Sequence, residues 1–244
     1  MYVDGRRIDA NRTLSSGQLL RVHLKPKRFP VAGIDWRASI VHADEQFVVV
    51  NKPAGIPVHA TVDNRFENLL YQLQEHVGIL TRVTQRLDTD VGGLIVIAKT
   101  REFQREFNRL LAERKVSKQY RALVHAPLET GRYVHYMERS ARSPKTVVSE
   151  NREGWLHCAL SIVRVEAKGD LFELEIDLET GRTHQIRAQL AALGSPIAGD
   201  QLYGSSIELP SIRLFCCRLS WSEWSFTLDP SWYDCGPNVR MSIT

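Results

Sequence analysis

Two acidic side chains, Asp88 and Asp90, lie just before a pair of glycines and an apolar run in residues 85–99, which read QRLDTDVGGLIVIAK. Catalytic groups are commonly displayed on a loop that a rigid element holds in place. An ionised carboxylate in such a loop can act as a nucleophile or a base. Asp also shapes turns through hydrogen bonds between its side chain and the backbone. Taken alone, this segment favours the turn interpretation.

A second polar segment, residues 179–204, strengthens the chemical interpretation of the first. It reads ETGRTHQIRAQLAALGSPIAGDQLYG, and Arg182, His184, Gln185 and Arg187 crowd the turn before a short helix. Capping a helix does not need so many polar groups. His184 itself is expected to brace the loop through a hydrogen bond rather than to carry protons, because no second titratable group is paired with it in sequence. Arg187 lies about 100° around the helix from inward-facing Ile186, so it can reach from the edge of the core into a cleft. We expect a carboxylate as its partner there.

The elements that must position these residues can be predicted from hydrophobic periodicity. Apolar or alternating runs predict strands over residues 47–51, 94–98, 119–124, 171–178 and 213–221, and amphipathic patterns predict helices over 67–77, 101–114 and 183–193. These segments lack the regular spacing of a parallel βαβ fold. The expected class is α+β, a mixed and mainly antiparallel sheet with flanking helices.

The first residues differ from the rest in charge. Up to Arg37 the chain holds eight basic and three acidic residues, a balance of 8 − 3 = +5, whereas the whole chain carries +4. A polyanion such as RNA suits such a cluster, although a solvated surface patch would have the same composition. Turn signals and prolines predict a small β appendage with its linker over residues 1–30 and a main domain over 31–244.

Several classes of protein do not fit the composition. No apolar run approaches the roughly 20 residues that span a bilayer, so we expect a soluble cytoplasmic protein without a membrane partner. The four cysteines lack the paired spacing of a zinc site, and a chain of this size does not need disulfides to fold, so we expect reduced, structural thiols. Phosphate-loop, HExxH and Rossmann glycine signatures are also missing from the sequence. We therefore expect neither a metal nor a cofactor. We also expect the protein to be a monomer.

Four segments together carry a resemblance to a known family. Residues 85–99 resemble the catalytic motif of the RluA-type pseudouridine synthases, usually written H-R-L-D-x-x-T-S-G-L-L-L-x-A-K. VNKPAGIPVHA at 50–60 resembles the first motif of the family, KQYRALV at 118–124 its tyrosine-bearing segment, and TGRTHQIRAQLAALGSPIAGDQLYG its last motif. The order and spacing also agree over residues 39–221, and such a set seldom arises by chance.

The resemblance implies isomerisation of uridines to pseudouridine in ribosomal or transfer RNA, without a cofactor. It assigns Asp88 as the essential aspartate, Tyr120 as the tyrosine stacking near the target base, and Arg187 as the partner that holds the Asp88 carboxylate by a bidentate contact. Arg86 matches the arginine that fills the space left by the flipped base, and we place Arg182 and Ile186 with it as substrate-binding residues. Asp88 acts either by covalent attack on ribose or base, or by removing a ribose proton to form a glycal.

The sequence departs from the family pattern at Gln85, which replaces His, and at Val91-Gly92, which replaces Thr-Ser. The N-terminal stretch resembles the β-rich end of a small RNA-binding fold without its leading helices. These departures motivate a rival hypothesis, a catalytically silent RNA-binding or ribosome-assembly factor. A glycosidase using Asp88 and Asp90 is a weaker alternative, because residues two apart on an extended loop tend to point away from each other.

Overall fold

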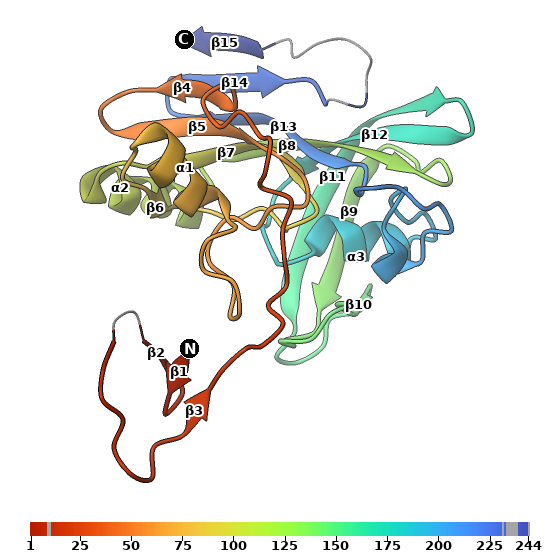
Figure 1. The fold of residues 1–244 in the computed structure, drawn as a ribbon. Coiled ribbons are helices and arrows are strands. Elements are labelled where there is room, and N and C mark those ends of the chain that lie inside the picture. Colours follow the sequence, from red (N-terminus) through yellow and green to blue (C-terminus); the bar gives the residue numbers. More distant parts are fainter. Residues whose placement is uncertain (9–10, 231, 233–238, 244) are drawn as a thin grey trace.

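The computed structural model describes residues 1–8, 11–230, 232 and 239–243. The main body is one large curved sheet with helices packed against it (Figure 1). Along the sheet the strands follow one another in the order β10 (Val147–Val148), β9 (Gly131–Met137), β11 (Leu156–Lys168), β12 (Leu171–Leu178), β8 (Ser117–Val124), β13 (Leu214–Trp221), β7 (Gly92–Ala98), β5 (Phe47–Lys52) and β4 (Ile40–Ala43).

Nearly all of the described neighbours in this sheet run antiparallel, and β13 with β7 is a parallel pair. Three further strands join it off this path: β6 (Arg82–Val83) pairs with β7, β14 (Trp224–Leu228) pairs with β13, and β15 (Val239–Ile243) pairs with β14. The expected α+β class with a mixed, mainly antiparallel sheet is therefore confirmed. The five predicted strands are all present, within one or two residues of the expected bounds.

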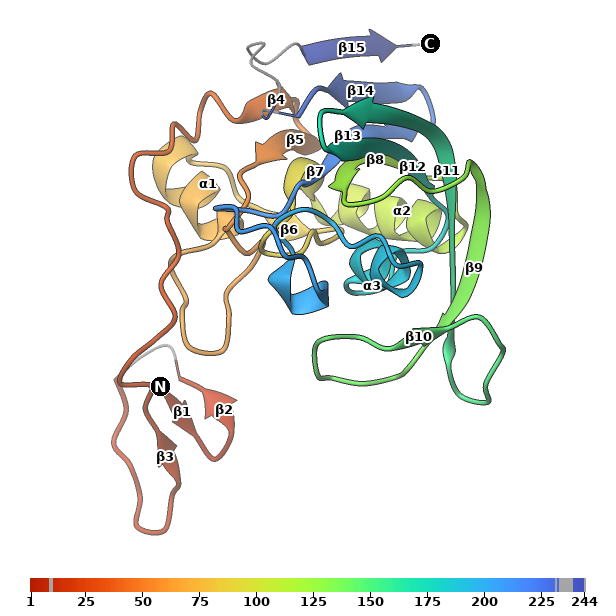
Figure 2. The same ribbon diagram turned by 90° about the vertical axis from the view of Figure 1, so that its right-hand side faces the viewer.

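Strict alternation along β5 and β7 builds a core on each side of the sheet. Val48 and Ile95 face helix α1 (Leu69–Val77), which buries Leu69 and Leu73 against them. The neighbouring side chains face the opposite way, where α2 (Arg101–Ala112) and α3 (Gln185–Ala192) pack. Figure 2 shows α1 separated from α2 and α3 by these strands. Every side chain of β7 is buried, as expected for a central strand.

The helix ends follow the signals in the sequence. Gly78 ends α1 in the left-handed conformation that glycine adopts without a steric penalty, with φ at 78°. On α2, Glu102 pairs with Arg105 and Glu106 with Arg109, so the arginine stripe of this helix is the solvated, ion-paired face that the spacing predicts. Helix α3 begins at Gln185 rather than at residue 183, because His184 has a left-handed backbone.

The N-terminal strands form a separate small sheet in the order β2 (Arg6–Arg7), β1 (Tyr2–Val3) and β3 (Leu20–Arg21), which projects from the main body in Figure 1. The Tyr2 hydroxyl donates to the Val62 carbonyl of the main body at 2.6 Å. Phe29, within the expected linker, is buried in the core beside α1 together with Trp36. The segment after the small sheet is thus packed onto the main body.

Among the described residues, no helix combines the length and the apolar character needed to cross a membrane. Cys158, Cys216 and Cys217 are buried free thiols, in agreement with the expectation of reduced structural cysteines. Cys235, which carried the same expectation, lies outside the described residues.

Candidate active site

A pocket of about 760 Å³ lies where the two polar segments of the sequence meet. Most of its walls come from four parts of the chain that lie far apart in sequence: residues 57–61 after β5, residues 85–89 with Val91 before β7, the end of α2 with β8, and residues 178–187 from the end of β12 to the start of α3. All six residues predicted for the site line this pocket: Arg86, Asp88, Tyr120, Arg182, Ile186 and Arg187. The structure therefore brings the predicted set together.

The loop that carries Asp88 is held in place by Lys52, which is not among the residues predicted for the site. The Nζ atom of Lys52 donates to three backbone carbonyls, those of Pro53 at 2.8 Å, Ile56 at 2.7 Å and Thr89 at 3.1 Å. The Gly55 amide also donates to the Thr89 carbonyl, at 2.8 Å. Residues 50–60 and the Asp88 loop are thereby joined into one unit.

Lys52 is fully buried, which makes its charge expensive. Burial lowers the pKa of Lys52 to about 7, and the carboxylates of Asp90 and Asp88 oppose this lowering. The sequence does offer a signal for Lys52 as a site residue: it directly follows the apolar strand predicted over residues 47–51 and lies inside the motif at residues 50–60. The three carbonyl partners could not be inferred, because they depend on how two distant turns pack together.

Arg187 makes its strongest contact with a residue other than the one expected. Its Nε and one terminal nitrogen, Nη2, donate to the two carboxylate oxygens of Asp200 at 2.6 and 2.8 Å. The remaining nitrogen, Nη1, lies 3.5 Å from Asp88 Oδ2. The expected ion pair between Arg187 and Asp88 is present, but the expected bidentate contact between them is wrong. The bidentate contact of the guanidinium is made with Asp200, and both of these side chains are almost completely buried.

Neighbouring carboxylates stabilise the charged form of Arg187. Burial works against the charged form, but the hydrogen bonds and charge of Asp200, together with the charge of Asp88, raise the pKa of Arg187. A permanently charged guanidinium thus stands beside the Asp88 carboxylate. Asp200 lies in GDQLYG at the end of the last motif, so the sequence marks it as part of a motif. No local pattern indicates that it faces Arg187.

His184 also approaches Asp88, which its place in the sequence does not indicate. Its Nε2 atom lies 3.8 Å from Asp88 Oδ2, and its Nδ1 atom lies 3.0 Å from the Tyr203 hydroxyl. The expectation of a loop-bracing histidine rested on the lack of a titratable partner nearby in sequence. The partners come instead from segments about 96 residues before it and 19 residues after it.

The remaining predicted residues occupy distinct positions around the pocket. Tyr120 on β8 is 6% exposed, and burial raises the pKa of its hydroxyl well above the ordinary value, so the phenol stays protonated. Ile186 provides a buried apolar wall. Arg86 and Arg182 are exposed, and Arg182 Nε donates to the His157 carbonyl at 3.5 Å. Their placement fits the predicted roles, which stay predictions.

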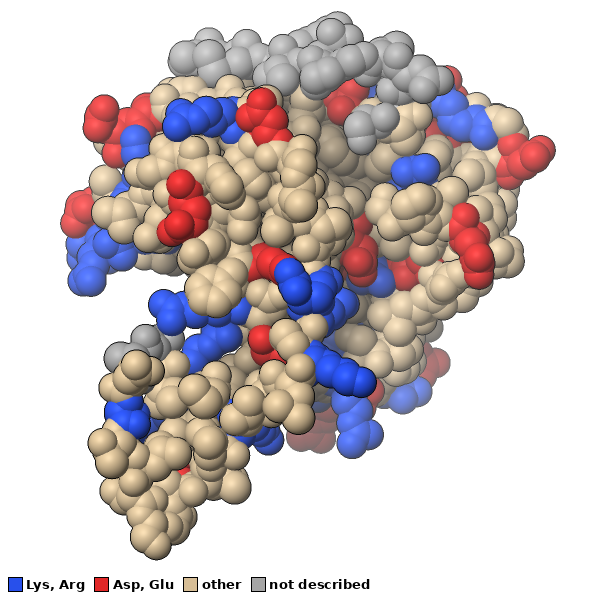
Figure 3. All heavy atoms as spheres, viewed as in Figure 1, with Lys and Arg blue, Asp and Glu red and all other residues tan. Residues whose placement is uncertain are grey.

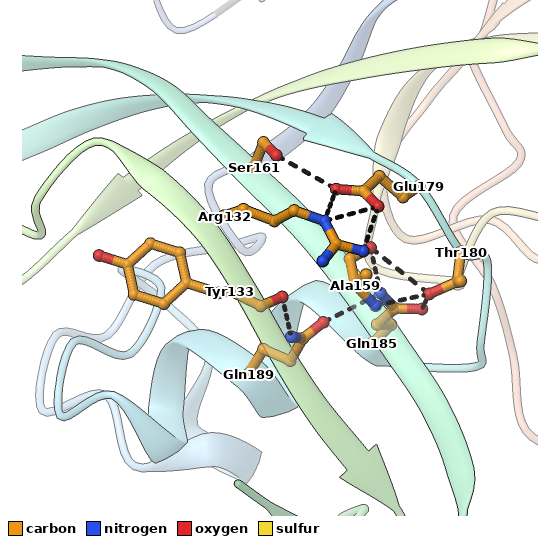
Figure 4. A network of polar contacts seen from close by, with 8 residues as sticks. All are labelled: Arg132, Tyr133, Ala159, Ser161, Glu179, Thr180, Gln185 and Gln189. Atoms are coloured by element: carbon orange, nitrogen blue, oxygen red, sulfur yellow. Dashed lines mark hydrogen bonds and ion pairs between the residues drawn. The ribbon is translucent and has the colours of Figure 1, made fainter.

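A buried amide network fixes the turn from which α3 starts (Figure 4). The Gln185 side chain accepts from the Thr180 hydroxyl at 2.8 Å and from the Arg182 amide at 3.0 Å, and donates to the Ala159 carbonyl on β11 at 3.1 Å. Gln189 continues the network to the Tyr133 carbonyl on β9 at 3.4 Å. The crowding of polar groups seen in the sequence is therefore partly structural, because Gln185 and Gln189 anchor the helix to the sheet. Arg187, on the same helix, faces Asp88.

The departures from the family pattern are accommodated by the packing around β7. Val91 is buried, and its amide donates to the Asp88 carbonyl at 3.1 Å. A Cβ atom on Gly92 would lie 3.3 Å from the Phe215 ring and 3.4 Å from the Lys52 carbonyl, so this position is tight for a side chain. Bracing of the loop comes from Lys52 and Gly55 rather than from hydroxyl side chains here.

Taken together, the fold and the site define an α+β protein whose pocket presents a carboxylate between a guanidinium and an imidazole, with a protonated phenol beside them. Residues 46–192 match the family model described as RNA pseudouridylate synthase. The chain belongs to this family, and the resemblance to RluA-type pseudouridine synthases is confirmed.

Individual relatives agree with this assignment. "RNA pseudouridine synthase 6, chloroplastic" of Oryza sativa subsp. japonica is 36% identical over 235 residues, covering 85% of this chain and 49% of the relative. "Ribosomal large subunit pseudouridine synthase D" of Xylella fastidiosa is 37% identical over 180 residues, covering 70% and 53%. The chain thus spans about half the length of these relatives.

Among solved structures, "Human RNA Pseudouridylate Synthase Domain Containing 1" superposes with a TM-score of 0.62 at 23% identity, covering 84% of this chain and 82% of that one. A second human protein, "RNA Pseudouridylate Synthase Domain Containing 4", superposes with a TM-score of 0.59 at 20% identity. These structures share the fold of this chain.

Proposed function

We propose that this protein isomerises specific uridines to pseudouridine in structured RNA, with Asp88 as the essential carboxylate. The observation that carries the proposal is the convergence of Asp88, Tyr120 and Arg187 in one pocket from three distant parts of a chain that belongs to this family. Ribosomal RNA is the favoured substrate, because several relatives are named as synthases of the large ribosomal subunit. Transfer RNA, a cytoplasmic location and a monomeric state stay predictions.

The pocket suits the steps that this isomerisation requires. The bond between ribose and base must break, the base must turn, and a bond to carbon must form, all without loss of the base. Asp88 is partly exposed at the pocket, with 21% of its side chain accessible, so it can meet the substrate while the buried Arg187 guanidinium lies 3.5 Å away. Enclosure by the pocket walls retains the detached base while it rotates.

The uridine must first leave its stack, which costs a few kcal/mol that contacts with the protein recover. Tyr120 offers a neutral ring for stacking against the base. Arg86 is exposed at the pocket and is long enough to enter the space that the base leaves in the RNA. Figure 3 shows that Lys and Arg side chains gather where the N-terminal sheet meets the main body, a surface suited to the phosphate backbone.

The test is a map of pseudouridines in total RNA from a deletion strain, compared with the same strain carrying the wild-type gene or Asp88→Asn. We expect one or a few sites to vanish on deletion, to return with the wild type and to stay absent with Asp88→Asn. A map unchanged by deletion would contradict the proposal. Return of a deletion phenotype to normal with Asp88→Asn would instead support the silent RNA-binding or assembly factor.

A further inference from the structure

The surroundings of His184 suggest a role that goes beyond bracing a loop. His184 adopts φ 59° and ψ 20°, a left-handed backbone that is strained for a non-glycine residue. It occupies the N-cap of α3, yet its side chain makes no capping hydrogen bond. The imidazole instead points at the pocket, where it lies between Tyr203 and Asp88. Such strain is commonly retained where a side chain must be aimed.

A backbone amide determines how the protons are arranged along this chain of contacts. The Lys145 amide donates to the Tyr203 hydroxyl at 2.8 Å, so that oxygen already serves as an acceptor. Within the described part of the chain, His184 Nδ1, at 3.0 Å, is the acceptor available for the hydroxyl proton. A neutral imidazole that accepts at Nδ1 carries its own proton at Nε2. That Nε2–H faces Asp88.

The imidazole is neutral under ordinary conditions, as this arrangement requires. Burial lowers the pKa of His184, and the charges of Arg187 and Lys145 act in the same direction, while Asp88 and Asp200 oppose them. The tyrosine ring is itself fixed, because the Arg187 guanidinium lies 5.0 Å from its centre. Tyr203 therefore links the two groups that approach the carboxylate.

Both of those groups make their closest approach to the same carboxylate oxygen. Arg187 Nη1 lies 3.5 Å and His184 Nε2 lies 3.8 Å from Asp88 Oδ2. These distances are longer than a hydrogen bond, which is common in a site that tightens when substrate binds. Two donors on Oδ2 orient the carboxylate and leave Oδ1 as the oxygen that meets the uridine.

We propose that His184 is a positioning residue for Asp88: Lys145 and Tyr203 lock it as the Nε2–H tautomer, and this N–H, together with Arg187, holds Oδ2 so that Oδ1 performs the chemistry. The inference rests on the proposed uridine isomerisation for its kinetic part. The tautomer itself is a property of the folded chain and is measured without substrate.

The first experiment measures the tautomer by ¹⁵N NMR of the full chain with labelled histidine, with the His184 signals identified by their loss in His184→Gln. We expect the Nε2–H form in the wild type. Tyr203→Phe keeps the ring over Arg187 but removes the hydroxyl, so a substantial Nδ1–H population should appear. A wild-type His184 that carries its proton at Nδ1, or a tautomer unaffected by Tyr203→Phe, would overturn the proposal.

The second experiment compares single-turnover rates of two neutral substitutions. The amide nitrogen of Gln reaches the position of Nε2, and a carboxylate selects its N–H, whereas Asn reaches only the position of Nδ1. We expect His184→Asn to lower the rate on the order of 10²-fold, as a misoriented reacting group does, with RNA affinity unchanged and His184→Gln much less affected. His76→Gln, on the exposed side of α1, is the control for histidine loss and should match the wild type.

Equal rates for the Gln and Asn variants, or a loss confined to RNA affinity, would contradict the positioning role. Failure of the wild type to form any pseudouridine would refute the proposed function, while the NMR result would still decide the tautomer. The two failures are therefore distinguishable.

Discussion

At the scale of single residues, the site depends on a buried ion pair beneath the reactive carboxylate. Arg187 and Asp200 expose only 3% and 1% of their side chains, and the fork between them fixes the nitrogen that faces Asp88. Removing one partner of a buried pair leaves the other charge without compensation, which is costly. Asp200 thus acts on Asp88 through Arg187.

Asp200→Asn should therefore lower both stability and activity. We expect the free energy of unfolding, measured with denaturant, to fall by about 3–5 kcal/mol, with a reduced rate of pseudouridine formation. Glu102→Gln removes an exposed, solvent-screened pair with Arg105, and its effect on the free energy of unfolding should be much smaller. Similar losses in the two variants would contradict a structural role for the buried pair.

Lys52 gives a prediction with a defined pH range. Its folded pKa of about 7 lies below the ordinary unfolded value of about 10.4. Between these values the unfolded chain binds a proton that the folded chain lacks, so Lys52 makes the free energy of unfolding rise with pH, by up to about 1.4 kcal/mol per unit.

Lys52→Met should flatten this rise between about pH 7 and 10, as measured by denaturant unfolding at a series of pH values. The control is Lys115→Met, an exposed lysine whose loss should leave the slope unchanged. An identical slope in the wild type and Lys52→Met would show that Lys52 keeps its proton throughout this range.

Residue types and motifs were sufficient to predict which side chains gather in the pocket, but not how they pair. Asp88, Tyr120 and Arg187 lie in motifs that the sequence displays. Asp200 and Lys52 lie in the same motifs, yet their partners are a guanidinium thirteen residues away and a carbonyl 37 residues away. Such contacts depend on tertiary packing, which periodicity does not report.

At the scale of elements, β7 places the Asp88 loop against β13. Gly93 on β7 has φ at +108°, and a Cβ atom there would lie 2.4 Å from the Cys216 carbonyl oxygen. Gly92 is less restricted, because its nearest contact is the Phe215 side chain at 3.3 Å. The close backbone approach at Gly93 makes the parallel pair possible.

Gly93→Ala should lower the free energy of unfolding by more than about 1 kcal/mol, since both backbone conformation and space oppose a side chain. Gly92→Ala is the matched control and should cost less. Thermal or denaturant unfolding of the two variants measures the difference. Equal stability of Gly93→Ala and Gly92→Ala would contradict this steric restriction, because β7 and β13 would then have to move apart at Gly93 without a cost in stability.

Elements with regular patterns were predicted well, and irregular ones were missed. The apolar run of β7 and the stripe of α2 are repeated over the whole element, so local sequence suffices. The 13-residue strand β11 was not predicted. Its pairing with β12 shifts between Ile162 and Arg164, and such a bulge interrupts the alternation that marks a half-buried strand.

At the scale of the whole molecule, basic side chains gather where the N-terminal sheet meets the main body (Figure 3). Arg6, Arg12 and Arg21 lie on this sheet or its loops and are exposed. Each phosphate that a cation neutralises releases counterions, which makes RNA affinity depend on salt. Combined substitution of these arginines by Gln should weaken RNA binding and lower the slope of log affinity against log salt by about 1 for each phosphate that is no longer neutralised.

The control for this measurement is Arg101→Gln with Arg105→Gln on α2, where Glu102 already compensates charge on the exposed face. Binding assays over a series of salt concentrations should show an unchanged slope for this control. An unchanged slope for the N-terminal variant would contradict a role of the small sheet in RNA binding.

The proposed isomerisation of uridine in RNA with Asp88 as the essential carboxylate can be tested by one rate measurement. Purified wild-type protein and Asp88→Asn are mixed with RNA from deletion cells, and pseudouridine is quantified over time after digestion to nucleosides. We predict that the wild type forms pseudouridine and that Asp88→Asn forms none while it still folds and binds the same RNA. Product formation by Asp88→Asn at the wild-type rate would contradict the proposed essential role of Asp88.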